Sequence, residues 1–320
     1  MTKPLIYISR KIPKEIIVPY ETKFEFRMWE KENEPVPRRV LIQELKEVDG
    51  LLCLLTEKVD KDLLEAAPQL KIIANMAVGY DNITIDSAND RGVVVTNTPD
   101  VLTETTADLT FTLMLATARR IVEAADYIRS DRWEHWSPYL LAGSDIHHKT
   151  IGIVGMGRIG EAVARRAKGF GMSVLYHNRS RKIEAEKELQ AKYTSFDQLL
   201  KEADFVVSMV PLTDSTRKIF NREAFGKMKS SAIFINASRG GTVDEDDLLE
   251  ALQTKEIKAA GLDVYTEEPI RGDHPLMNLT NAVCFPHIGS ASIETRTAML
   301  QLCLENLAGY FYGDGPKTPV

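Results

Sequence analysis

Twelve residues, Lys149-Thr-Ile-Gly-Ile-Val-Gly-Met-Gly-Arg-Ile-Gly160, contain the pattern that decides the fold of this chain. An apolar strand expected over Ile151–Val154 leads into Gly155-x-Gly157-x-x-Gly160, and a helical pattern follows. The first glycine permits a tight turn, the second lets the backbone approach a pyrophosphate, and the third allows close helix packing. The start of that helix offers free N–H groups and partial positive charge to phosphates. The stretch therefore predicts a dinucleotide site, formed by Gly155, Met156, Gly157, Arg158, Ile159 and Gly160.

Further strands follow this stretch at the spacing of a βαβ repeat. A second strand expected at Ser173–His177 completes the first unit, which favours a dinucleotide site over a merely structural glycine turn. Later apolar runs predict four more strands, at Phe205–Val210, Ala232–Asn236, Gly261–Val264 and Val283–Phe285. Six strands with intervening helices predict a doubly wound parallel sheet.

The first hundred residues show the same alternation but contain no glycine-rich phosphate loop. Strands are expected at Leu5–Ser9, Gly50–Leu55, Ile72–Met76 and Val93–Thr96, with a weaker one at Phe24–Trp29. Near-continuous apolar strands separated by helices indicate a second parallel sheet covered on both faces. An amphipathic helix over Ser290–Tyr312 comes after the last strand of the other sheet, so we expect it to return to this first domain.

The predicted fold class is therefore α/β with two doubly wound parallel-sheet domains. A Rossmann dinucleotide-binding domain, residues 101–287, is inserted in a flavodoxin-like substrate domain made of residues 1–100 and 288–320. One long helix is expected from about Leu102 to Ile128, with an apolar surface suited to burial between domains or subunits. The following segment, 130–149, lacks periodicity and carries Trp133 and Trp136, which favours a partner surface and a homodimer.

Composition excludes several classes of protein. The chain has 320 residues, 44% of them hydrophobic, and a net charge of −6, which gives no reason to expect nucleic acid or an anionic membrane as partner. The N-terminus lacks the apolar region of a signal peptide, and no apolar run is long enough to span a bilayer. The three cysteines have no metal-site spacing and read as small apolar residues, so we expect no metal and a reducing, cytoplasmic location.

Three charged residues follow expected strands, where open α/β sheets place their ligands. Arg239 follows Ile233–Asn236, Glu268 lies in Thr-Glu-Glu-Pro, and His287 comes after Val-Cys-Phe-Pro. Each alone could be a solvated charge or a turn residue. Together they supply what ketone reduction needs, because histidine, with an ordinary pKa of roughly 6.5, can protonate the alkoxide that hydride transfer leaves. A carboxylate favours the imidazolium, and a guanidinium can bind a substrate carboxylate bidentately.

Longer motifs around these residues resemble the D-isomer-specific 2-hydroxyacid dehydrogenases over essentially the whole chain. They are Phe234-Ile-Asn-Ala-Ser-Arg-Gly-Gly-Thr-Val-Asp244, Gly261-Leu-Asp-Val-Tyr-x-x-Glu-Pro269 and Pro286-His-Ile-Gly289. Within that family the chain is most similar to the glyoxylate/hydroxypyruvate reductases, through Val78-Gly-Tyr-Asp81, Thr98-Pro-Asp-Val-Leu-Thr103 and Trp133-x-x-Trp136.

The resemblance implies a catalytic set of Arg239, Glu268 and His287. It implies that backbone N–H groups at Val78 and Gly79 hold the substrate carboxylate, which suits a glycine-containing turn. Leu55 would line the substrate pocket, and Trp136 would reach the active site of the neighbouring subunit; alternatively, both tryptophans merely pack a dimer interface. Further cofactor contacts are expected at Thr106, Val210, Pro211, Ala237, Asp263 and Gly289, although Asp263 could equally be a capping or turn residue.

The end of the second strand indicates which cofactor is preferred. NAD binders place an acid there, about 20 residues beyond the glycines, to bind the ribose hydroxyls. In this chain Asn178 occupies that place, and Arg179, Ser180 and Lys182 follow, which could bind a 2′-phosphate. A solvated basic turn is the alternative. We therefore expect NADPH to be preferred, with NADH possible.

The sequence as a whole predicts an NADPH-dependent reductase of small 2-oxo acids, glyoxylate and hydroxypyruvate, giving glycolate and D-glycerate. The nearest alternatives are 2-ketogluconate reduction and phosphoglycerate oxidation. An alternative of another class is a non-catalytic, corepressor-like NAD(P)-binding protein on the same fold. An NADPH-oxidation assay separates the enzyme from the binding protein, and a panel of 2-oxo acids separates the enzymes from one another.

Overall fold

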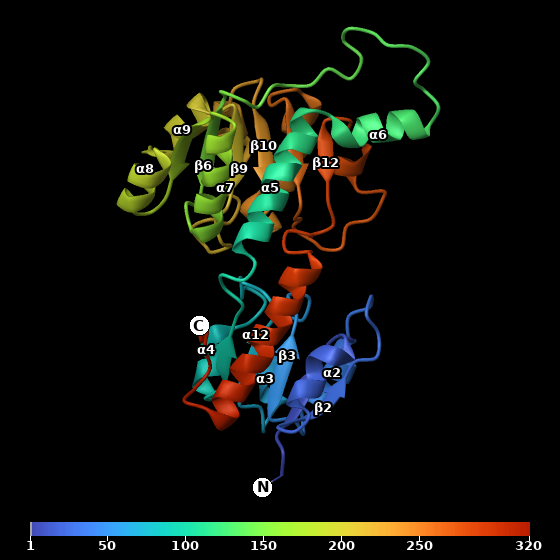
Figure 1. Cartoon of the computed structure of the whole chain (residues 1–320), viewed down its shortest axis with the longest axis vertical. Helices are drawn as coiled ribbons and strands as arrows, with labels where there is room; N and C mark the ends of the chain where they lie inside the picture. The colour runs from blue at the N-terminus through green and yellow to red at the C-terminus, as the bar shows by residue number, and fades with distance from the viewer. Residues whose placement is uncertain (1) are drawn as a thin grey trace. The chain divides into compact units, whose positions relative to one another are not determined.

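The computed structural model describes residues 2–320, which divide into two compact units. Unit 1 comprises Met1–Leu102 and Ala291–Val320, and unit 2 comprises Thr103–Ser290. Each unit has its own parallel β-sheet covered by helices (Figure 1). The expected fold class, two parallel-sheet α/β domains, is confirmed.

The sheet of unit 1 has five parallel strands in the order β2-β1-β3-β4-β5. This is the flavodoxin-like order, in which the strand sequence reverses between β1 and β3. Residues of β3 and β4 are all buried because helices cover both faces of the sheet. The strands are β1 (Leu5–Ile8), β2 (Glu25–Met28), β3 (Gly50–Cys53), β4 (Ile72–Asn75) and β5 (Val94–Thr96).

Two sets of helices cover the sheet of unit 1. Leucines of α2 and α3 and Ala88 of α4 join one apolar core. The long C-terminal helix α12 packs against β4, and its Leu307 lies over Gly50. A Cβ at Gly50 would come 2.7 Å from Ile6 Cδ1 and 3.2 Å from Leu307 Cδ2, so α12 packs closely on the sheet at this glycine. The helices are α1 (Lys14–Ile17), η1 (Val18–Tyr20), α2 (Arg38–Glu44), α3 (Lys61–Glu65), α4 (Ile85–Asp90) and α12 (Ile293–Tyr312).

The sheet of unit 2 has seven parallel strands in the order β12-β11-β10-β9-β6-β7-β8. Sequence reasoning expected six, and the seventh, β8, is only Lys192–Tyr193 paired with Leu175 and Tyr176 of β7. The order reverses between β6 and β9, which is the Rossmann pattern. The strands are β6 (Thr150–Val154), β7 (Ser173–His177), β8 (Lys192–Tyr193), β9 (Phe205–Ser208), β10 (Ile233–Asn236), β11 (Ala259–Leu262) and β12 (Ala282–Cys284).

Helices cover both faces of this second sheet. Side chains of α5, α7 and α8 join one core cluster, and those of α9, α10 and α11 join another. Gly152 in β6 is required by the second cluster, since an added Cβ would lie 2.5 Å from Leu199 Cδ2. The helices are α5 (Thr103–Ala118), α6 (Ile121–Arg129), α7 (Arg158–Gly169), α8 (Ile183–Leu189), α9 (Phe196–Glu202), α10 (Arg222–Lys227), η2 (Gly240–Thr242), α11 (Glu245–Gln253) and η3 (Pro275–Asn278).

The single long helix expected from Leu102 to Ile128 is wrong, because the structure breaks it into α5 and α6. Arg120 adopts a left-handed φ of 53°, which ends α5 and redirects the chain. The free carbonyl of Ala118 accepts the Ser144 N–H at 2.8 Å, and Gly143 packs so closely that a Cβ would lie 2.2 Å from that oxygen. The returning loop thus stabilises the break. Between α6 and this return, residues 130–142 make a long excursion (Figure 1).

Candidate functional site

Three neighbouring strands of unit 2 carry Arg239, Glu268 and His287 past their carboxyl ends. Strand β10 pairs with β11 through Asn236 and Leu262, and β11 pairs with β12 through Leu262 and Cys284. Each charged residue lies in the segment that follows its strand. Carboxyl ends of adjacent parallel strands meet at one edge of a sheet, which is where doubly wound folds bind ligands.

Glu268 and His287 form a direct side-chain pair. His287 Nδ1 lies 2.6 Å from Glu268 Oε2, and Glu268 Oε1 accepts the Tyr265 N–H at 3.0 Å. About a quarter of each side chain is exposed, 24% for His287 and 26% for Glu268, so a small molecule can reach the imidazole. With Nδ1 directed at the carboxylate, Nε2 is the ring atom that remains for a reacting group.

Tyr265 fixes this pair and was not anticipated from the sequence. Its hydroxyl donates to Phe285 O at 2.9 Å and to Leu262 O at 3.2 Å, which joins the ends of β11 and β12. Burial, together with the neighbouring Cys284, raises the pKa of Tyr265 well above its ordinary value, so the hydroxyl keeps its proton and remains a donor. A tyrosine within the Gly-Leu-Asp-Val-Tyr motif, three residues before Glu268, is the signal that could have found it.

The Arg239 loop packs directly on the Glu268 loop. A Cβ added at Gly240 would lie 1.8 Å from the carbonyl carbon of Tyr265, so only glycine permits this approach. Two side chains hold the arginine's backbone in place, since its carbonyl accepts Asn236 Nδ2 at 3.0 Å and Thr242 Oγ1 at 2.7 Å. Its guanidinium donates from Nη1 to Ser238 O at 2.8 Å. The structure therefore brings the loops of all three charged residues together.

The glycine-rich turn after β6 has the shape that its sequence predicts. Gly155 has a φ of 104°, and a Cβ there would lie 2.5 Å from the Met209 carbonyl carbon. A Cβ at Gly160 would lie 2.3 Å from Gly155 O, so α7 packs closely on the turn. At Gly157 a Cβ would meet nothing within 4 Å, which leaves open space beside the backbone. This is the geometry that a phosphate group needs in order to approach a helix N-terminus.

Asn178 is engaged with the glycine turn itself. Its Oδ1 accepts the Met156 N–H at 2.7 Å, and its Nδ2 donates to Met156 O at 3.2 Å. The side chain thus ties the end of β7 to the turn after β6. Arg179 and Ser180 are exposed, and Lys182 Nζ lies 3.9 Å from Glu161 Oε1. Arg181 pairs with Glu186, whereas among residues 2–320 Arg179 has no such partner.

Asp263 is a buried carboxyl at the end of β11. Its Oδ1 accepts the Ile288 N–H at 2.8 Å, as a residue that stabilises a turn would. Among the described residues, its Oδ2 has no hydrogen-bond partner. Burial raises the pKa of Asp263 to about 6. A Cβ at Gly289 would lie 3.3 Å from that Oδ2 and 3.4 Å from Thr106 Cγ2. An unused buried acceptor beside Gly289 fits a cofactor that offers an amide donor.

The other residues expected to bind the cofactor or substrate lie as follows. Val210 adjoins Gly155, whose added Cβ would lie 2.8 Å from Val210 N; Pro211 is exposed and Ala237 half-buried. Leu55, Val78 and Gly79 belong to unit 1, in the segments after β3 and β4, and are half-buried. Trp136 belongs to the 130–149 segment of unit 2 and is 75% exposed.

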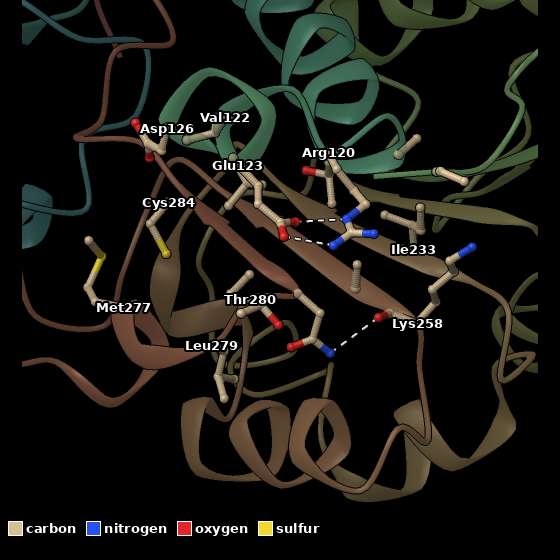
Figure 2. Close-up of a pocket in the computed structure, with 18 of the residues that line it drawn as sticks. Arg120, Val122, Glu123, Asp126, Ile233, Lys258, Met277, Leu279, Thr280 and Cys284 are labelled. Atoms are coloured by element: carbon tan, nitrogen blue, oxygen red, sulfur yellow. Dashed lines mark hydrogen bonds and ion pairs between the residues drawn. The ribbon is translucent and has the colours of Figure 1, made fainter. Parts of the chain in front are cut away.

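A cavity of about 680 Å³ in unit 2 lies apart from these residues. It is bounded by α6 on one side and by η3 and β12 on the other (Figure 2). Arg120 and Glu123 form an ion pair on its wall, with both nitrogen–oxygen distances at 2.7 Å. Its described lining includes none of the predicted site residues, so we do not assign the reaction to it.

Two kinds of feature are absent from residues 2–320. No group of three or more His, Cys, Asp or Glu side chains is placed to hold a metal ion. None of the helices in this part of the chain combines the length and apolar character needed to cross a bilayer.

Comparison with known proteins identifies the family of the chain. Residues 111–289 match the family model described as D-isomer specific 2-hydroxyacid dehydrogenase, NAD binding domain. The chain belongs to this family. It is 49% identical to a glyoxylate reductase of Thermococcus kodakarensis over 99% of this chain and 96% of that protein. The family expected from the sequence motifs is therefore confirmed.

Solved structures of the family superpose closely on the chain. The TT0316 protein from Thermus thermophilus has a TM-score of 0.92 at 42% identity, with 99% of each chain covered. An NADPH-dependent glyoxylate/hydroxypyruvate reductase of Sinorhizobium meliloti, solved with NADP and malonate, has a TM-score of 0.88 at 35% identity. That match covers 100% of this chain and 97% of the other. This D-2-hydroxyacid dehydrogenase is accordingly an oxidoreductase that uses a nicotinamide cofactor.

Proposed function

We propose that the protein reduces small 2-oxo acids, glyoxylate and hydroxypyruvate foremost, to D-2-hydroxy acids with NADPH. The observation that carries the proposal is the Glu268–His287 pair at 2.6 Å, beside the Arg239 loop at the carboxyl edge of the sheet. Membership of the family supplies the reaction class. The glyoxylate reductase and glyoxylate/hydroxypyruvate reductase relatives support the choice of substrate.

The proposed chemistry needs three actions from these residues. The bound cofactor supplies the hydride that the carbonyl carbon receives. His287 gives a proton from Nε2 to the carbonyl oxygen, because its Nδ1 is directed at Glu268. Glu268 favours the imidazolium and fixes the ring plane. Arg239 binds the substrate carboxylate and polarises the adjacent carbonyl.

Residues of unit 2 would hold the cofactor. Gly155, Met156, Gly157, Arg158, Ile159 and Gly160 would receive the pyrophosphate, and the unpartnered Oδ2 of Asp263 would accept from the nicotinamide amide. Arg179 supports NADPH over NADH, since it is exposed, cationic and unpaired among the described residues. Because Asn178 already bonds Met156, we assign it to shaping the turn, and we assign the 2′-phosphate to Arg179, Ser180 and Lys182.

We also propose that the protein is a homodimer. Helix α6 has no buried residue, and it exposes Ile121, Val122 and Ile128. Trp133 and Trp136 extend this apolar surface along the 130–149 segment. Exposed apolar side chains gathered in this way mark interaction surfaces, and a two-fold pair would cover the same patch on both copies. Trp136 would then reach the partner's active site.

A steady-state assay tests the proposed function. NADPH oxidation is followed with glyoxylate, hydroxypyruvate, 2-ketogluconate and longer 2-oxo acids, and kcat/KM values are ranked. We expect glyoxylate and hydroxypyruvate to rank highest and the His287→Ala enzyme to be inactive on all of them. A wild-type protein that binds NADPH but turns over no 2-oxo acid would contradict the proposal and favour a binding role.

A further inference from the structure

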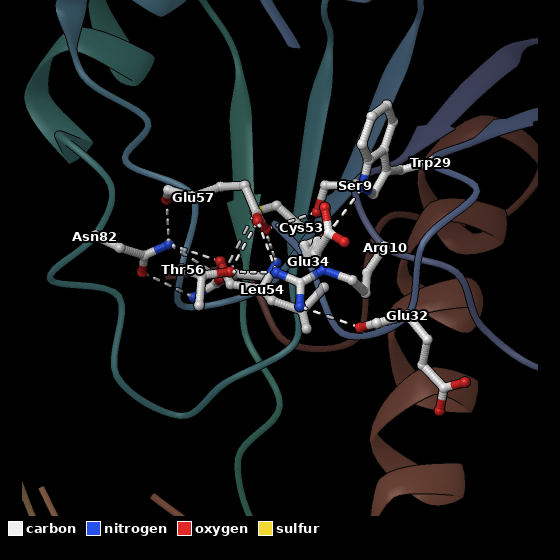
Figure 3. Close-up of polar contacts among 11 residues, drawn as sticks. Ser9, Arg10, Trp29, Glu32, Glu34, Cys53, Leu54, Thr56, Glu57 and Asn82 are labelled. Carbon is white, nitrogen blue, oxygen red and sulfur yellow. Dashed lines mark hydrogen bonds and ion pairs between the residues drawn. The ribbon is translucent and has the colours of Figure 1, made fainter. Parts of the chain in front are cut away.

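Two loops of unit 1 are joined by a polar network centred on Asn82 and Glu57 (Figure 3). One loop is Leu54–Glu57, which follows β3, and the other is Ala77–Asn82, which follows β4. The first contains Leu55, and the second contains Val78 and Gly79. Asn82 and Glu57 take no part in the reaction proposed above, so the many hydrogen bonds that they make need another explanation.

Asn82 holds the first loop by its backbone. Its Nδ2 donates to Leu54 O at 3.2 Å and to Glu57 O at 3.0 Å. Its own carbonyl accepts the Val59 N–H at 2.8 Å, so side chain and main chain both bind the same segment. Because one side-chain amide binds both carbonyl oxygens, it fixes the distance between them and so the shape of the loop.

Glu57 anchors the same loop to the sheet. Only 4% of Glu57 is exposed. Its Oε2 accepts Ser9 Oγ at 2.6 Å and Leu54 N at 2.8 Å, while Oε1 accepts Thr56 Oγ1 at 2.8 Å. Arg10 Nη2 lies 3.5 Å from Oε1. Every partner is a donor, which suits a carboxylate and not a carboxamide.

The second loop is held by its carbonyl oxygens. Ala77 O accepts the Thr98 N–H at 2.8 Å, Val78 O accepts Asn97 Nδ2 at 2.8 Å, and Gly79 O accepts Asn75 Nδ2 at 3.1 Å. Asn75 Nδ2 also donates to Asn82 Oδ1 at 3.3 Å, which joins this loop to the network.

Fixed carbonyls determine where the following N–H groups point. These peptide bonds are trans, and a trans peptide directs its N–H opposite to its C=O. The amides of Val78, Gly79 and Tyr80 are therefore turned away from the three bound carbonyls. Within residues 2–320, none of these amides donates to a protein acceptor. Consecutive unused N–H groups in a turn can bind an anion together.

The network occupies the point where the strand order of unit 1 reverses. Ser9 and Arg10 follow β1, and Glu57 follows β3, the two strands on either side of the reversal. Ligands of open α/β sheets bind outside the strand ends at such a point. We propose that Asn82 and Glu57 are positioning residues that lock the two loops together and so aim the Val78 and Gly79 N–H groups at the substrate carboxylate. This inference rests on the proposed function.

A matched pair of asparagines tests the inference. Asn281 in unit 2 bridges two carbonyls in the same way, with Nδ2 donating to Leu252 O at 3.1 Å and Lys258 O at 3.2 Å. Asn82→Asp and Asn281→Asp each set a carboxylate oxygen against two carbonyls, so both should lower Tm. Only Asn82→Asp should raise the KM for glyoxylate, by about tenfold or more, as expected for a lost carboxylate contact. The KM for NADPH should stay within about twofold of wild type in both.

A matched pair of carboxylates tests the other half of the network. Asp49 accepts the Leu5 N–H at 3.0 Å at the opposite end of β3. Glu57→Gln sets an amide NH₂ group against groups that are themselves hydrogen-bond donors. It should therefore raise the KM for glyoxylate as Asn82→Asp does, whereas Asp49→Asn should not. Hydrogen–deuterium exchange should show faster exchange over both residues 54–58 and 77–82 in Glu57→Gln and Asn82→Asp, and over neither in the controls. Asn82→Ala replaces Asn82→Asp if the latter does not fold.

The outcomes separate the inference from the proposed function. A wild-type enzyme that reduces glyoxylate, with an unchanged KM in Asn82→Asp and Glu57→Gln, overturns the positioning role alone. Parallel rises in the KM values for glyoxylate and NADPH also overturn it, since they indicate general loss of structure. A wild-type protein inactive on every 2-oxo acid overturns the proposed function, and the inference with it.

Discussion

His287 Nδ1 and Glu268 Oε2 lie 2.6 Å apart, and the second oxygen of that carboxylate is held by the Tyr265 N–H at 3.0 Å. The carboxylate therefore cannot turn away from the imidazole without breaking a backbone hydrogen bond. This arrangement holds the negative charge of Glu268 directly against the imidazole of His287.

Replacing Glu268 by Gln removes the charge and keeps the shape. Reduction needs a protonated His287, so kcat/KM falls as pH rises and the imidazolium is lost. Without the carboxylate the imidazolium is less favoured, and the basic limb of the pH profile should move to lower pH. The profile of kcat/KM for glyoxylate measures this shift. A basic limb that stays in place would show that Glu268 does not act through His287.

Arg179 should decide between NADPH and NADH. Arg179→Ala should weaken NADPH binding by about 1.5–3 kcal/mol, the size of a hydrogen bond to a charged group, and leave NADH nearly unchanged. Arg181→Ala is the matched control, because Arg181 is also exposed but already pairs with Glu186. Dissociation constants from fluorescence titration measure both. Equal or better kcat/KM with NADH in the wild type would contradict the predicted preference.

The buried Asp263 should make stability depend on pH. Its pKa in the folded protein is about 6, above the ordinary 3.8, so its contribution to stability is complete below pH 3.8 and is lost as pH rises through 6. The gain in unfolding free energy from Asp263→Asn should therefore grow by about 2 kcal/mol between pH 4 and 7. Urea unfolding across this range measures the difference between the variant and wild type.

Asp204 serves as a control, because its contribution to stability should change with pH in the opposite direction. Burial raises its pKa, but Lys229 and the Thr150 N–H lower it by more, so the net shift is downward. Its stabilising effect is present above its ordinary pKa and lost as pH falls. Asp204→Asn should therefore be most destabilising near pH 7. Identical pH trends for the two variants would refute the assignment for Asp263.

Mixed dimers test whether Trp136 acts in the neighbouring subunit. Trp136→Ala and His287→Ala subunits are combined, so that only one site of the heterodimer retains His287. If Trp136 acts across the interface, that site receives its tryptophan from the His287→Ala subunit and should reject longer 2-oxo acids as wild type does. Relative kcat/KM values for glyoxylate and a longer oxo acid give the readout. Selectivity no better than that of the Trp136→Ala homodimer would rule the role out.

Much of this fold was predictable because its signals are local. Apolar runs bounded by turn residues placed eleven strands near their observed positions, and the spacing of Gly155, Gly157 and Gly160 placed the phosphate turn. Strand β8 was missed, since two residues such as Lys192–Tyr193 carry no pattern. The break at Arg120 was missed because a distant segment, at Gly143 and Ser144, stabilises it.

The residues around the candidate site were harder to predict where their partners are distant in sequence. Asn178 stands where an acid is usual, but its bonds to Met156 become visible only once β6 and β7 are paired. Nothing in the sequence singles out Glu57 and Arg10 as partners, since they lie 47 positions apart. Their one local signal is that each closely follows an apolar strand, β3 or β1.

The order of synthesis gives α12 a particular importance. All five strands of unit 1 have left the ribosome once Thr96 has emerged, but the helix that covers one face of their sheet begins only at Ile293. Throughout translation of unit 2, the nascent sheet lacks Met299, Leu304 and Leu307, which are buried in the finished protein. Unit 2 has all its strands and helices before that helix appears. The N-terminal sheet is therefore the last to be completed, and until then its uncovered apolar face is a natural target for chaperones.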